Sequence, residues 1–204
     1  MRATKLIRMI VILSLWASPL FQTTIRADNQ VMGALKFSAA TDAEKDSGVW
    51  IDGQYMGYVR ELKGKKKIFL LPGFHEIAIR QAGYQELTNK VLVEPADVQM
   101  VDVHMLKNPT AIYPGKNAAI LKFDITPDRS AVFIDDTYLG PASKFGGFFN
   151  SMTIEPGKHR VKIELAGYRT FETEISVLPE QKLEIRTDLV KGSIEQASPL
   201  IMHR

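Results

Sequence analysis

Two histidines are the residues with the most obvious chemical potential in this sequence. His75 and His159 each stand two positions after a Pro-Gly pair, in the segments 71–75 and 155–159. A histidine can act as a general base or as a metal ligand. A metal site needs three or more convergent ligands, however, and strand alternation places each histidine on the same face as apolar residues. We therefore interpret both as structural histidines bonded to the backbone at a strand edge.

Other signatures of chemistry are missing from the sequence. The chain has no cysteine, which removes disulfides, thiol chemistry and a lipid-modified cysteine from consideration. No glycine-rich phosphate loop, nucleophile elbow, His-Glu-x-x-His motif or calcium loop occurs. The sequence therefore predicts a protein that is not an enzyme and has no catalytic residues, no metal site and no cofactor.

An internal repeat organises the chain. The segment 51–57, Ile-Asp-Gly-Gln-Tyr-Met-Gly, returns as Ile-Asp-Asp-Thr-Tyr-Leu-Gly at 134–140. Two later blocks return at nearly the same spacing. Those blocks pair Pro72, Gly73 and His75 with Pro156, Gly157 and His159, and Gly83 and Tyr84 with Gly167 and Tyr168. The repeated unit covers residues 33–107 and 118–190.

Each repeat has the pattern of β-strands. Apolar and polar residues alternate along 75–80 and 159–165, and turn residues recur about every ten positions. Pro-Gly suits the corner of a type II turn, so 71–73 and 155–157 are predicted as hairpin corners between antiparallel strands. The glycine of each Gly-Tyr pair is predicted in a turn, with the tyrosine at the sandwich edge. The fold class predicted is all-β: two small tandem antiparallel β-sandwich modules.

Residues outside the repeats have other predicted roles. Residues 1–27 read as a cleavable signal peptide, a basic start followed by an apolar run too short to span a membrane. Residues 108–117 read as a linker and 191–204 as a C-terminal tail. Without residues 1–27 the chain is close to neutral, which argues against nucleic acid as a partner. We expect an exported protein, periplasmic or at the cell surface, with no transmembrane segment after cleavage.

The order of the repeated blocks resembles the PEGA-domain family of bacterial and archaeal surface proteins. The resemblance lies in Ile-Asp-Gly-x-Tyr-x-Gly, then Leu-Pro-Gly-x-His-x-Ile-x-Ile, then Gly-Tyr, and it covers both copies. It implies a small β-sandwich in a cell-envelope protein, with no catalytic residues to transfer. Any activity must still be argued from the residues of this chain.

The two copies also offer candidate binding surfaces. Lys63, Lys65, Lys66 and Lys67 form a basic run, while the second copy carries Phe145, Phe148 and Phe149 in the corresponding loop. Trp50 and Phe133 share one repeat position on the strand face opposite the predicted core. They form either an exposed aromatic patch or a surface covered by the linker and the neighbouring module. The sequence thus leaves two hypotheses: a structural or protein-interaction module that binds an envelope protein, or a binder of envelope polysaccharide that uses these aromatics.

Overall fold

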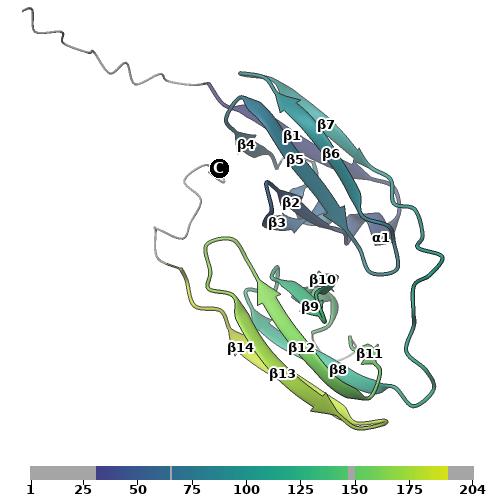
Figure 1. Ribbon diagram of the computed structural model, residues 1–204. Coiled ribbons are helices and arrows are strands. Elements are labelled where there is room, and N and C mark those ends of the chain that lie inside the picture. The colour runs from purple at the N-terminus through teal and green to yellow at the C-terminus, as the bar shows by residue number, and fades with distance from the viewer. Residues whose placement is uncertain (1–30, 65, 147–149, 193–204) are drawn as a thin grey trace, which may run out of the picture.

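The structure is a computed structural model, and it describes residues 31–64, 66–146 and 150–192. The expected signal peptide and most of the expected tail lie outside these ranges. The described chain forms two modules of seven strands each, joined by the segment between β7 (Val98–Val103) and β8 (Ala119–Thr126) (Figure 1). The predicted all-β fold in two tandem modules is confirmed.

The first module contains two sheets packed face to face. One has the strand order β4-β1-β7, with β1 at Gly33–Ala39 and β4 at Ile68–Leu70. The other sheet has the strand order β3-β2-β5-β6. Its strands are β2 Gly48–Ile51, β3 Gln54–Tyr58, β5 Gly73–Arg80 and β6 Leu87–Val93. Two single-turn helices connect these strands: α1 (Asp42–Lys45) lies between β1 and β2, and α2 (Val59–Leu62) between β3 and β4.

The second module repeats this topology strand for strand. Its sheets have the orders β11-β8-β14 and β10-β9-β12-β13. The strands are β9 Ala131–Ile134, β10 Thr137–Pro141, β11 Met152–Ile154, β12 Gly157–Glu164, β13 Phe171–Val177 and β14 Lys182–Asp188. A 3-10 turn, η1 (Ala142–Lys144), takes the place of α2. The same sequence blocks therefore build the same strands twice, whereas α1 has no counterpart between β8 and β9.

The core of each module lies between its sheets and comes from the alternation seen in the sequence. In the first module the largest fully buried side chains include Phe37, Val49, Ile77 and Ile79. Their counterparts in the second module, among them Phe123 and Ile163, are equally buried. Each sandwich therefore buries one face of each sheet, which leaves the outer faces free for other contacts.

The Pro-Gly corners differ from the prediction. Gly73 and Gly157 both have φ of 144°, a region that strongly favours glycine, as the sequence indicated. The strands that flank each corner do not form a hairpin, however. β4 pairs with β1 and β11 with β8, whereas β5 and β12 belong to the other sheets. The hairpin assignment is wrong because each Pro-Gly turn carries the chain from one sheet to the other.

One pair of strands in each module is parallel. β1 pairs with β7, and β8 pairs with β14, over registers of six and seven residues. These strands are the first and last of their modules. Their pairing closes each repeat on itself, and it departs from the fully antiparallel arrangement expected.

Candidate functional site

The modules contact each other through four aromatic side chains. Trp50 and Tyr55 project from the outer face of the β3-β2-β5-β6 sheet, and Phe133 and Tyr138 from the equivalent face of the second module. The ring centroids of Trp50 and Tyr138 are 5.1 Å apart at 87°, and those of Trp50 and Phe133 are 6.0 Å apart. Figure 1 shows β2 and β3 facing β9 and β10 across this contact.

This contact corrects the interpretation of Trp50 and Phe133 as a ligand surface. Both side chains are only 3% exposed, because each packs against the other module. Arg80 lies over the Trp50 ring and Lys162 over the Phe133 ring. The polysaccharide hypothesis therefore loses its two main residues, since neither ring is free to stack on a sugar.

Hydrogen bonds follow the same twofold relation as the rings. The Tyr55 hydroxyl donates to the Arg129 carbonyl oxygen, and the Tyr138 hydroxyl donates to the Asp46 carbonyl oxygen, each at 3.3 Å. Asp46 and Arg129 occupy the same repeat position, as do the two tyrosines. Burial raises the pKa of both tyrosine hydroxyls well above its ordinary value. The perturbed tyrosines are thus explained by the contact between modules.

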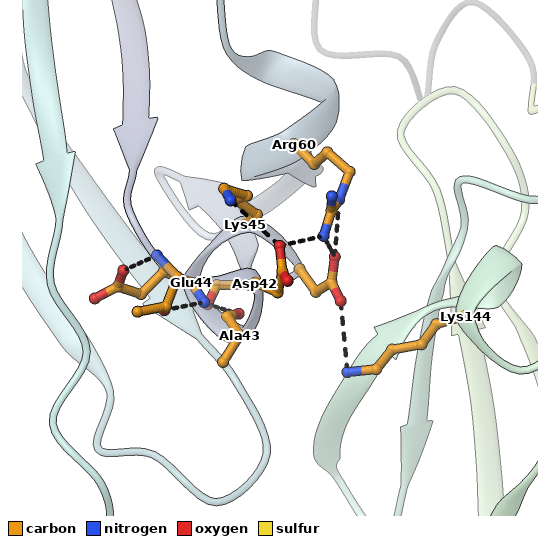
Figure 2. Close-up of polar contacts among 9 residues, drawn as sticks. Asp42, Ala43, Glu44, Lys45, Arg60 and Lys144 are labelled. Carbon is orange, nitrogen blue, oxygen red and sulfur yellow. Dashed lines mark hydrogen bonds and ion pairs between the residues drawn. The ribbon is translucent and has the colours of Figure 1, made fainter.

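Two ion pairs flank the aromatic cluster. Arg129 Nη1 lies 2.9 Å from Glu61 Oε1, and Lys144 Nζ lies 3.8 Å from Asp46 Oδ2. Figure 2 shows Lys144 reaching from the second module toward the first, on the side where Arg60 lies. Arg60 itself bonds Asp46 at 2.9 Å and so holds that carboxylate in place within the first module.

The histidines form a repeated bridge between two turns. The His75 ring bonds the Asp52 carboxylate through Nδ1 at 2.6 Å and the Leu71 carbonyl oxygen through Nε2 at 2.8 Å. His159 makes the equivalent bonds, to the Asp135 carboxylate at 2.7 Å and to the backbone carbonyl two residues before its glycine at 2.8 Å. With both nitrogens engaged, each ring ties the Pro-Gly corner to the turn after β2 or β9.

The aspartates of these bridges occupy strained turn positions. Asp52 and Asp135 have φ of 51° and 49°, and each accepts a backbone hydrogen bond from the residue after its histidine. Burial tends to raise the pKa of Asp135, but the bond from His159 and the backbone N–H of Arg160 outweigh it and hold that pKa below its ordinary value. The bridge therefore stabilises a charged carboxylate.

The Gly-Tyr pairs lie in clefts beside the contact between modules. Tyr84 lines a cleft of about 410 Å³ with Arg80, Glu86 and Asp136. Tyr168 lines the twofold-related cleft of about 210 Å³, opposite Tyr55. Gly83 and Gly167 both have φ of about 80° and turn the chain just before each tyrosine.

The remaining predicted surface residues do not gather into one site. Phe145 is 7% exposed and packs on Phe123, with ring centroids 6.0 Å apart, so it is a core residue and the surface assignment is wrong for it. Lys63 and Lys66 are exposed and Lys67 is half-buried, all near the end of α2. Lys65, Phe148 and Phe149 lie outside the described residues.

Reasoning from the sequence missed an exposed apolar pair. Phe74 on β5 is 76% exposed and pairs across the sheet with Leu92 on β6, which is 45% exposed. The equivalent pair in the second module is Lys158 and Ser176. The signal was available in the repeat, because an outward strand position that is charged in one copy is phenylalanine in the other.

Two further features concern residues 31–64, 66–146 and 150–192, the part of the chain that the structure describes. This part of the chain contains no group of three or more His, Cys, Asp or Glu side chains arranged to hold a metal ion. None of its helices has the length and apolar character needed to cross a membrane.

Comparison with known proteins supports the resemblance drawn from the motifs. Residues 124–193 match the family model described as PEGA domain. The second module is a PEGA domain. The first module has the same strand order and the same histidine bridge, which is consistent with a second, divergent copy of the PEGA domain.

Other comparisons are distant. No curated protein matches the chain. A solved structure described as "The Bacillus anthracis TIE protein" aligns with a TM-score of 0.27 and 10% sequence identity. The alignment covers 79% of this chain and 34% of that one, so the present chain spans about a third of the length of that structure.

Proposed function

We propose that the protein is a non-catalytic, exported protein-interaction module of the bacterial cell envelope. The observation that carries the proposal is the exposed pair of Phe74 and Leu92 on the outer face of the first module. An exposed aromatic side chain beside an aliphatic one forms the kind of anchor that dominates protein interfaces. The β-sandwich of the first module, which is consistent with a divergent copy of the PEGA domain, supplies the scaffold for this anchor.

The surroundings of this pair match the anatomy of an interface. Phe74, Asp52, Glu76 and Lys90 line a shallow depression of about 440 Å³. Glu76 and Lys90 are cross-strand partners, so the apolar centre is bordered by charges of both signs. A polar rim around an apolar anchor excludes water while it selects the partner. The partner that fits is another envelope protein with an apolar pocket and a mixed-charge border.

Part of the outer surface of this sheet is covered by the second module. The end of β5 that contains Ala78 and Arg80 is covered by the second module or lies beside it. The end that contains Phe74 lies beyond that contact. The module can therefore hold its neighbour and a partner on the same face at the same time.

Site-specific photo-crosslinking in the producing bacterium tests this proposal. A benzoylphenylalanine at position 74 is expected to yield an adduct with one envelope protein, and the adduct should disappear when Leu92→Ser removes the neighbouring side chain. The matched control places the same crosslinker at position 158, the equivalent position of the second module, where no adduct is expected.

The same cells test export. The protein should fractionate with the envelope and begin near residue 28, as read by mass spectrometry of its N-terminal peptide. Recovery of an uncleaved protein from the cytoplasm would contradict the envelope assignment. Equal crosslinking at positions 74 and 158 would contradict the assignment of Phe74 as the anchor.

A further inference from the structure

The contact between the modules has a twofold relation that can be checked residue by residue. Val59 N bonds Ser47 O at 3.0 Å, and Ala142 N bonds Ser130 O at 2.8 Å, so the segments 46–61 and 129–144 correspond in register. The two tyrosine hydrogen bonds between modules follow the same correspondence. Each module thus presents the same face to the other, as subunits do in a symmetric dimer.

The ion pairs at the two edges break this symmetry in charge. The first module places Asp46 and Glu61 at the two edge positions, and the second places Arg129 and Lys144 at the same two positions. Across the contact, position 46 faces 144 and position 61 faces 129. At these two positions the first module has carboxylates and the second has cations, although Arg60 of the first module also pairs with Asp46.

We propose that this face is a heterotypic recognition surface: the first-module face accepts the second-module face of its own chain and rejects a face of its own kind. Two first-module faces in the same geometry would place Asp46 against Glu61 at both edges. Two second-module faces would place Arg129 against Lys144 at both edges. Like charges opposed across an interface disfavour the wrong partner.

The sizes of the side chains at the centre of the contact also favour pairing of a first-module face with a second-module face. Trp50 and Phe133 occupy equivalent positions in the two modules and pack against each other, with 6.0 Å between their ring centroids. Phe133 has the smaller ring. The first module compensates for its larger ring with Gly48, where the second has Ala131. Two first-module faces would bring two indole rings together and overfill the centre, and two second-module faces would leave it underfilled.

Two single substitutions recreate the like-charge encounters within the intact protein. Glu61→Lys gives the first module the charge of the second and opposes Arg129, as two second modules would. Lys144→Glu opposes Asp46, as two first modules would. Each is expected to lower the melting temperature by about 2–4 °C at low salt. Glu61→Gln, which removes the charge without reversing it, is the matched control and should lower it less.

The charge-exchanged variant Glu61→Lys/Arg129→Glu tests whether opposite charge at these two positions accounts for the loss in melting temperature. It restores an opposite pair with the signs reversed, so most of the lost melting temperature should return. The deficit of each single variant should also shrink in about 0.5 M salt, which a packing defect would not do. The proposal would be overturned if the double variant melts no higher than Glu61→Lys alone. It would also be overturned if Glu61→Lys and Lys144→Glu both melt like the original protein.

Discussion

Adding one methyl group at Gly48 tests the packing at the centre of the contact between modules. Gly48 begins β2 and lies beneath the ring of Trp50. A Cβ at this position would lie 2.6 Å from Cη2 and Cζ3 of Trp50 and 2.8 Å from Cζ of Tyr138. Both rings are buried to 3% exposure, so neither can move aside into solvent. Gly48→Ala must therefore shift the ring of Trp50, the ring of Tyr138 or both.

Two opposing terms set the magnitude of the effect. Replacing glycine by alanine reduces the freedom of the unfolded chain and stabilises by about 0.4–1 kcal/mol where the backbone allows it. The backbone does allow it here, since Ala131 occupies the equivalent strand position. Overpacking a buried site costs about 1–3 kcal/mol. The expected net loss is about 1–2 kcal/mol, which lowers the melting temperature by about 2–8 °C in a protein of this size.

The second module supplies the control for this experiment. It combines Ala131 with Phe133, so the double variant Gly48→Ala/Trp50→Phe copies a pair of side chains that already fits. Urea unfolding followed by circular dichroism is suitable, because Trp50→Phe removes the main fluorophore of the described chain. The free energies of the two substitutions should couple favourably by about 1 kcal/mol or more.

Two results would refute this account of the packing. If Gly48→Ala stabilises the protein, the rings yield more freely than their burial indicates. If the two substitutions are additive within about 0.3–0.5 kcal/mol, Gly48 does not compensate for the size of Trp50.

Three further predictions concern single modules. Gly73→Val and Gly157→Val should each lower the free energy of unfolding by about 1–3 kcal/mol, because valine does not tolerate φ of 144°. Unchanged denaturation curves would contradict the assignment of these Pro-Gly turns as glycine-requiring connections between the two sheets. The pKa of Glu44 is lowered by the backbone N–H at the start of α1, so its stabilisation is present above pH 4.5 and is lost as pH falls further. Glu44→Gln should flatten the melting temperature between about pH 5 and 3, and an unchanged slope would contradict this. Asp135→Asn should lower the free energy of unfolding, measured with urea, by about 1 kcal/mol because it weakens the bond to His159. An unchanged free energy of unfolding would show that this bond does not stabilise the module.

Local sequence was enough to predict the strands and their duplication but not which strands pair. The alternation along 75–80 reflects one buried sheet face, and the glycines at 73 and 157 have the positive φ that a turn requires. A turn signal, however, says only that the chain changes direction. Whether β4 then pairs with β5 or with β1 depends on strands that are distant in the sequence, and the parallel β1–β7 pair joins the two ends of the module.

The candidate site shows the same limit in a different form. Alternation places Trp50 and Phe133 on the outer face of their sheets, and the structure agrees. An outer face need not be exposed, because a second module can bury it, and periodicity within one strand carries no information on that second layer. A usable signal was nonetheless present across the repeat. Positions 46 and 61 exchange charge with 129 and 144, and two positions that change sign together are what a contact between the copies would produce.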